Sequence, residues 1–176
     1  MKKGIILYKS KYGSTKKYAN WLSVKTGYDL YELSKPAIKK ITGYKNIVMC
    51  GGVYASGISG ISFIKKRFKY FKNKNIAVFC VGASPLDESA LSALKSHNLK
   101  EELSAVPLFY GRGAWNESKM SFVDRTLCRM LIKFVSKKDP ETYEPWQSAL
   151  MEAVRKECDW TDERYLDPLI ELINEW

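Results

Sequence analysis

The sequence lacks the cysteine and histidine spacing that metal sites and redox dithiols require. Its four cysteines lie far apart, none belongs to a Cys-x-x-Cys pair, and His97 is the only histidine. Zinc and dithiol sites place such residues only a few positions apart. We therefore expect no metal centre, a surface position for His97, and burial of Cys50 and Cys80, which lie within apolar runs.

Long hydrophobic runs are also missing. None approaches the roughly 18 residues needed to cross a bilayer. The apolar stretch at residues 5–8 is short and has no small-residue cleavage site, which indicates a first strand and not a secretion signal. The 176 residues, 45% of them apolar, suit one globular domain. We expect a cytoplasmic protein.

Acidic residues are scarce before position 139. Residues 1–138 contain 26 Lys and Arg against 8 Asp and Glu (+18), and residues 139–176 contain 3 against 11 (−8), which sum to the net charge of +10. A basic body attracts nucleic acid, anionic lipid or acidic partners. Nucleic acid is disfavoured, because the basic residues are spread over several expected helices and no nucleic-acid motif occurs.

Short apolar runs alternate with amphipathic stretches along the chain. This alternation predicts an α/β fold, with a parallel sheet covered by helices on both faces. Ser84 and Pro85 are predicted to begin the third helix, with proline at the first helical position. Strands are expected at residues 5–8, 30–33, 47–50, 76–81 and 105–110, and helices at residues 14–26, 61–72, 85–100, 118–136, 146–157 and 162–175.

The position of Pro107 helps to order the strands. A proline cannot donate a hydrogen bond to a sheet ladder, so the fifth strand should lie at an edge. The second strand mixes polar and apolar residues, as an edge strand does. Both features fit a five-stranded parallel sheet in the order 2-1-3-4-5. We expect residues 1–138 to form this domain, and residues 139–176 to add an acidic helical C-terminal extension packed on it.

The turn between the first strand and the first helix has the composition of an anion-binding loop. Backbone N–H groups, hydroxyls and the positive end of a helix would surround an anion there, and glycine lets the backbone turn closely around it. The alternative is an ordinary turn whose Ser or Thr caps the helix. The turn matches neither the Walker pattern nor the dinucleotide pattern. It reads Ser10-Lys11-Tyr12-Gly13-Ser14-Thr15.

Two further loops end at the same edge of the expected sheet. Glycine allows a flat ring to approach the backbone, and Tyr54 is placed to stack on such a ring. Ligands of doubly wound sheets bind at this edge, where the strand order reverses. The loop after the third strand contains Gly52-Val53-Tyr54-Ala55-Ser56-Gly57, and the loop after the fourth begins Gly82-Ala83-Ser84.

The turn at residues 10–15 resembles the phosphate loop of flavodoxins, Ser/Thr-x-Ser/Thr-Gly-x-Thr. Ser10, Gly13, Ser14 and Thr15 are in register with it, whereas Tyr12 stands where many flavodoxins have a small hydroxyl residue. The resemblance implies flavin mononucleotide (FMN) as the cofactor. It also implies that the three loops hold FMN together with Trp115, which follows the fifth strand.

Over residues 4–146 the order of elements is similar to that of the flavodoxin-domain group that includes menaquinone-dependent protoporphyrinogen dehydrogenase. Residues 110–115 and 122–125 carry this likeness. The chain departs from that enzyme between the fourth and fifth strands, where a compact helix replaces a long insertion. The resemblance implies an FMN-binding electron carrier or oxidoreductase. The alternatives are a quinone-using dehydrogenase of that kind and a flavodoxin-fold binding module without a cofactor.

Arg125, Arg129, Lys133 and Lys137 recur every four residues on and just beyond the expected helix 118–136. One interpretation is an ordinary solvated helix face. The other is docking to an anionic membrane surface or an acidic redox partner, which is consistent with quinone use in the similar enzyme. The expected partners are therefore a redox protein, a quinone or another small molecule, and the inner face of a membrane.

Overall fold

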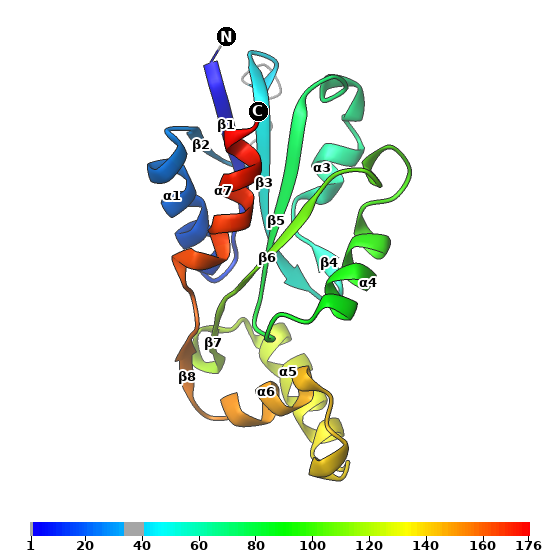
Figure 1. The fold of residues 1–176 in the computed structure, drawn as a ribbon. Coiled ribbons are helices and arrows are strands. Elements are labelled where there is room, and N and C mark those ends of the chain that lie inside the picture. The colour runs from blue at the N-terminus through cyan, green and yellow to red at the C-terminus, as the bar shows by residue number, and fades with distance from the viewer. Residues whose placement is uncertain (1, 34–40) are drawn as a thin grey trace.

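The computed structural model describes residues 2–33 and 41–176. Its centre is a parallel sheet with the strand order β2-β1-β3-β5-β6, which confirms the predicted order (Figure 1). A short strand, β4 (Gly57–Ile58), pairs antiparallel with β3. The five parallel strands are β1 (Lys2–Lys9), β2 (Asp29–Glu32), β3 (Tyr44–Tyr54), β5 (Asn75–Gly82) and β6 (Leu108–Arg112).

The central strands are buried on both faces. β1 and β3 align Ile6 with Val48 and Leu7 with Met49, and all four side chains are fully buried. Successive residues of a strand point to opposite faces, so Ile6 and Val48 belong to one apolar cluster and Leu7 and Met49 to the other. The uninterrupted apolar runs therefore mark strands that are covered on both sides.

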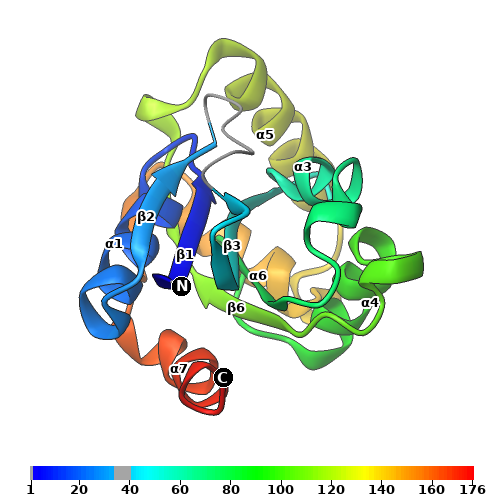
Figure 2. The same ribbon diagram turned by 90° about the horizontal axis from the view of Figure 1, so that it is seen from above.

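Two pairs of helices cover the two faces of the sheet (Figure 2). α1 (Ser14–Thr26) and α7 (Asp167–Asn174) share one face, where Tyr18, Leu22 and Leu169 are fully buried. α3 (Ile61–Lys65) and α4 (Glu88–Asn98) cover the other face. Both clusters use apolar side chains at helical spacing, as the amphipathic pattern predicted.

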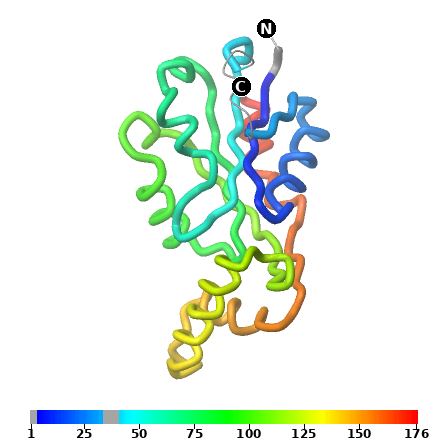
Figure 3. The backbone as a smooth tube through the Cα atoms, turned by 180° about the vertical axis from the view of Figure 1, so that it is seen from behind, coloured from blue at the N-terminus to red at the C-terminus, as the bar shows by residue number. Residues whose placement is uncertain are grey.

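Between β6 and α7 the chain leaves the sheet and then returns to it (Figure 3). A separate antiparallel pair, β7 with β8, joins the outgoing and returning segments. α5 and α6 contact each other at the end of the molecule beyond the carboxyl ends of the strands (Figure 1). Of the C-terminal elements, α6 and β8 therefore belong to the segment that leaves the sheet, whereas α7 packs against the sheet. The elements of the excursion are β7 (Ala114–Asn116), α5 (Phe122–Val135), α6 (Pro145–Ala153) and β8 (Glu157–Asp159).

The predicted length of the helix at residues 61–72 is wrong, because the helix in the structure is shorter. α3 ends at Lys65, and a separate 3₁₀ turn covers Phe68–Tyr70. The segment contains no acidic residue, and Lys65 and Lys69 stand four positions apart, where like charges destabilise a helix. Ile64 and Phe71 are nevertheless buried in the core.

Two prolines lie outside the elements that were expected to contain them. Pro85 does not begin α4, because Asp87 caps that helix and its carboxylate accepts a hydrogen bond from the Ala90 N–H at 2.7 Å. An Asp side chain satisfies a free N–H at a helix start, which proline cannot do. Pro107 precedes β6, and its carbonyl accepts a hydrogen bond from the Val78 N–H at 2.9 Å. β6 is an edge strand, as predicted.

The cysteines and the histidine lie as the sequence predicted. Cys50 and Cys80 are fully buried and reduced, and burial raises the pKa of both thiols, that of Cys80 to about 12. His97 is exposed on α4. Neither of these two thiols is therefore activated as a nucleophile near neutral pH.

Candidate cofactor site

The turn after β1 and the loop after β3 meet at the carboxyl edge of the sheet. The rings of Tyr12 and Tyr54 lie edge to face, with their centroids 6.4 Å apart. The Lys11 ammonium lies 5.8 Å from the centre of the Tyr54 ring, within the range of a cation–π contact. These two predicted segments therefore form one surface.

The loop after β5 is held against the same edge by the end of β6. The Tyr110 hydroxyl donates to the Ser84 carbonyl at 2.6 Å, and the Arg112 Nε donates to the Ala83 carbonyl at 3.1 Å. The Gly113 N–H donates to the Gly82 carbonyl at 2.7 Å. A Cβ atom added to Gly113 would also lie 3.4 Å from the Cβ atom of Ser14. Gly113 thus joins the third loop to the start of α1.

The start of α1 has the geometry of an anion site. Gly13 is the N-cap residue, with φ at 101°, and it has no side chain to cap the free N–H groups of the first turn. The first turn contains no acidic residue. A Cβ atom added to Gly13 would meet nothing within 4 Å. The free N–H groups and the positive end of the helix therefore lie beside open space.

The side chain of Ser10 shapes this turn from within. Its Oγ accepts a hydrogen bond from the Gly13 N–H at 3.1 Å, which closes the turn before the helix begins. Ser14 is half-buried and Thr15 is buried, whereas Lys11, Tyr12 and Gly13 are exposed. The residues of the turn that solvent can reach are therefore those that come just before the first turn of α1.

Asp124, in the first turn of α5, contacts the turn after β1 across the site. Its carboxylate accepts hydrogen bonds from the Lys11 ammonium and the Tyr12 hydroxyl, and the Ser121 N–H donates to that hydroxyl at 3.1 Å. The hydrogen bond from Lys11 is the main cause of a lowered pKa of Asp124, and Asp124 in turn raises the pKa of Lys11. Sequence reasoning did not place Asp124 here. Its signals were the pattern Ser121-x-x-Asp124, which is typical of a helix start, and its place among residues 122–125, which carry the family likeness.

The loop after β3 is a tight hairpin that joins this strand to β4. Ala55 and Ser56 both have positive φ angles, of 45° and 62°, and Tyr54 pairs with Gly57. Two successive residues of this kind form the turn that best matches the twist of paired strands. Neither position is a glycine, and the approach of a flat ring to this loop stays a prediction.

Tyr54 closes back over the strand that carries it. A Cβ atom added to Gly52 would lie 2.8 Å from the Tyr54 ring, so glycine makes room for this packing. The ring remains 38% exposed. Burial of the rest of the side chain is the main reason for its raised pKa, so the hydroxyl stays protonated at neutral pH. Tyr54 therefore presents a neutral aromatic surface at the edge of the sheet.

Asn98, at the end of α4, anchors this hairpin, a role that no sequence pattern indicated. Its side-chain oxygen accepts a hydrogen bond from the Ile58 N–H at 2.9 Å, and its amide donates to the Ser56 carbonyl at 2.7 Å. Asn98 is only 4% exposed, and a buried amide that loses such partners is costly. The hairpin is thereby fixed relative to the helix that packs under it.

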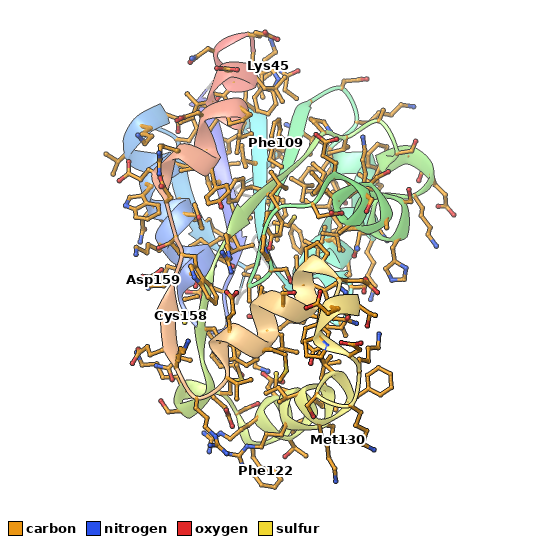
Figure 4. The ribbon with its side chains drawn as sticks, turned by 60° about the horizontal axis from the view of Figure 1, so that its bottom comes forward. Lys45, Phe109, Phe122, Met130, Cys158 and Asp159 are labelled. Atoms are coloured by element: carbon orange, nitrogen blue, oxygen red, sulfur yellow. The ribbon has the colours of Figure 1, made fainter. Side chains whose placement is uncertain are left out.

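Trp115 lies in β7, opposite Cys158 of β8 (Cys158 and Asp159 are labelled in Figure 4). The side chain is 8% exposed, and its indole N–H is buried without a hydrogen-bond partner in the part of the chain that the structure describes. A buried donor of this kind costs about 1–3 kcal/mol. A ligand oxygen would satisfy it, and the assignment of Trp115 to the cofactor site stays a prediction.

A polar cavity of about 420 Å³ lies outside the three loops. It is lined by residues of β7, α5, β8 and the segments that flank them, and includes Arg125, Arg155 and Glu157. No residue of the predicted cofactor site lines it. The loops at the sheet edge carry the stronger case, because they combine a helix start, open space and an exposed aromatic ring.

Five parallel strands in this order, with a glycine-capped helix start after the first, define a flavodoxin-like α/β protein. A family model described as "Flavodoxin domain" matches residues 5–142. The chain therefore belongs to the flavodoxin domain family. This match covers the sheet, the three loops and α5, and it ends before α6 and α7.

Several solved structures are similar to this chain at low sequence identity. The Trp repressor binding protein from Bacillus subtilis is 16% identical, with a TM-score of 0.49, over 64% of this chain and 84% of that chain. Two-electron reduced flavodoxin from Megasphaera elsdenii is 16% identical, with a TM-score of 0.46, over 61% and 82% of the two chains. RosB, with a bound riboflavin phosphate intermediate, is 11% identical, with a TM-score of 0.42, over 99% and 87%. No match was found among curated proteins.

Proposed function

We propose that this protein binds FMN at the carboxyl edge of its sheet and functions in electron transfer or as a flavin-dependent oxidoreductase. The observation that carries the proposal is the start of α1, where Gly13 leaves the first N–H groups uncapped beside open space. A phosphate is the group that such a site binds best. Membership of the flavodoxin domain family supports the same ligand.

The chain supplies binding and orientation at this site. The turn formed by residues 10–15 holds the phosphate through backbone N–H groups and hydroxyls, and Tyr54 offers its ring as a stacking surface. The loop that begins at Gly82 borders the ring edge, kept in place by Tyr110 and Arg112. The flavin, when bound, supplies the electron-transfer chemistry, and the protein sets its position and potential.

The contribution of the phosphate provides the test of this proposal. FMN and riboflavin share the same ring, so a site built on the phosphate should bind FMN at least about 100-fold more tightly, because two or more charge-assisted hydrogen bonds are lost with riboflavin. Titration calorimetry on the apoprotein measures both affinities. Equal affinities would show that the ring alone is recognised. Absence of binding to either would favour a flavodoxin-fold binding module without a cofactor.

The charge around the site predicts a less negative potential for full reduction than acidic flavodoxins have. The three loops carry few acids, Asp87 and Glu88 being the nearest in sequence, and the carboxylate that the structure adds, Asp124, is paired with Lys11. One negative charge at roughly 10 Å from the ring changes a one-electron potential by about 70 mV at an effective dielectric constant of ~20.

Asp124→Asn is therefore expected to raise the potential by tens of millivolts, because it removes the carboxylate beside Tyr12 and Lys11. Glu175→Gln is the matched control, since it removes an equal charge near the C-terminus, at the opposite end of the sheet (Figure 1). Redox titration with dye mediators gives both values. An equal shift in the two variants, or a parent potential as low as that of acidic flavodoxins, would contradict this account.

A further inference from the structure

The surface of α5 is unusually apolar for an exposed helix. Six of the eleven large apolar side chains that are exposed in the described part of the chain belong to it. Figure 4 shows Phe122 and Met130 at its outer surface, at the end of the molecule farthest from the sheet. A contiguous exposed patch of this kind marks an interaction site. The six residues are Phe122, Val123, Leu127, Met130, Leu131 and Phe134.

Four of these side chains form one stripe along the helix. Val123, Leu127, Met130 and Phe134 follow one another at spacings of four, three and four residues, which places them on one side. Val135 is the fully buried residue of α5. The apolar stripe therefore faces away from the protein body, and folding of the domain does not require it.

Cations border the apolar stripe. Arg129, Lys133 and Lys137 are exposed and recur every four residues. Arg125, which the sequence placed in the same basic row, turns inward and donates to the carbonyls of Glu117, Ser118 and Met120. The predicted basic stripe is therefore shorter by one residue, and it lies beside an apolar surface that the charge pattern did not reveal.

Acidic side chains are few on this helix, and the carboxylate of Glu117 is already paired with Arg129 at 2.6 Å. Residues 122–138 contain five Lys and Arg against one acid, Asp124, and Asp124 contacts Lys11 and Tyr12. A second copy of the chain would place lysines against lysines, because the carboxylates of Asp124 and Glu117 already have cationic partners. A surface that is both apolar and negatively charged fits the face better, and a phospholipid bilayer with anionic headgroups has that combination.

We propose that α5 docks this protein on an anionic bilayer surface, with the helix lying in the plane of the interface. The apolar stripe enters the boundary between headgroups and acyl chains, while Lys133 and Lys137 contact the phosphates. None of the helices in the described ranges is long and apolar enough to cross a membrane. Docking is thus peripheral, and it goes beyond the proposed flavin function.

Docking through α5 places the candidate cofactor site close to the membrane. Asp124 belongs to the first turn of α5 and contacts Lys11 and Tyr12 of the turn that precedes α1. The helix that meets the lipid is therefore the same helix that contacts the predicted phosphate loop. A redox partner dissolved in the bilayer or bound to it would approach the site from this side.

Vesicle co-sedimentation tests the proposal without any flavin readout, so its failure is distinct from a failure to bind FMN. Vesicles of equal parts phosphatidylcholine and phosphatidylglycerol should bind the full chain, and pure phosphatidylcholine should bind it about ten-fold more weakly. The variant Leu127→Gln/Phe134→Gln should lose about ten-fold or more of the binding to the mixed vesicles. Circular dichroism checks that the variant remains folded.

Two matched controls separate this surface from general hydrophobicity and charge. Val24→Gln/Tyr70→Gln removes two exposed apolar side chains that lie outside α5 and the loops beside it, and this variant should bind as the parent does. Lys65→Glu/Lys72→Glu changes the net charge as much as Lys133→Glu/Lys137→Glu, and only the latter should lose most of its binding at low salt.

Three results would overturn the proposal. The first is a failure of the parent protein to bind the mixed vesicles. The second is unchanged vesicle binding by Leu127→Gln/Phe134→Gln. The third is a dimer in sedimentation velocity that the same variant dissociates, which would assign α5 to contact with a second copy. Selective capture of an acidic protein by α5, with no vesicle binding, would likewise reject the bilayer as the partner.

Discussion

Gly13→Asp is expected to raise the dissociation constant for FMN at least about 100-fold, a loss near 2.7 kcal/mol. The substitution places a carboxylate beside the uncapped N–H groups of α1, where the phosphate is proposed to bind. The carboxylate competes for those donors and repels the phosphate dianion across a short distance. Calorimetric titration of the purified apoprotein with FMN measures the loss.

The variant should still fold, which makes the result interpretable. A Cβ atom at position 13 meets nothing within 4 Å, so no steric clash follows. The φ angle of 101° does impose strain on any residue other than glycine, of about 1–3 kcal/mol. Urea denaturation should therefore show a modest loss of stability alongside the large loss of affinity.

Gly27→Asp is the matched control, because it makes the same change at the other end of the same helix. Gly27 also has a positive φ, of 67°, and open space around its Cβ position. A carboxylate there opposes the negative end of the helix dipole and costs stability, but it lies far from the proposed phosphate site. FMN binding as weak in Gly27→Asp as in Gly13→Asp would show that strain in α1, and not the anion site, determines affinity.

The order of the sheet could be predicted because each strand carried its own local signal. Continuous apolar runs marked β1, β3 and β5 as covered on both faces, and Pro107 placed the last strand at an edge. The three loops then followed from the topology, since the carboxyl ends of parallel strands share one edge. Local composition and a small set of fold rules were sufficient for this part.

Contacts between distant parts of the chain left no such signal. Asp124 meets Lys11 across 113 positions, and Asn98 anchors a turn about 40 positions earlier. An amphipathic pattern says that a helix has an apolar side, but not what covers it. The same pattern therefore described α5, whose apolar side is exposed, and α7, whose apolar side is in the core.

That difference between α5 and α7 gives the second large expected effect, on stability. Leu169→Ala should lower the free energy of unfolding by about 2–5 kcal/mol, the usual cost of truncating a fully buried leucine. Leu169 packs in the cluster that contains Tyr18, Leu22 and Phe79, and so helps α1 to cover one face of the sheet. Urea denaturation followed by circular dichroism measures the change.

Leu127→Ala on α5 is the matched control, since it removes the same atoms from a side chain that is 58% exposed. Its free energy of unfolding should stay within about 0.5 kcal/mol of the parent value. Similar losses in the two variants would mean that α5 is covered in solution or that α7 is dispensable. A large loss in Leu169→Ala alone would show that α7 supports the fold, while the apolar surface of α5 is kept for a partner outside the chain.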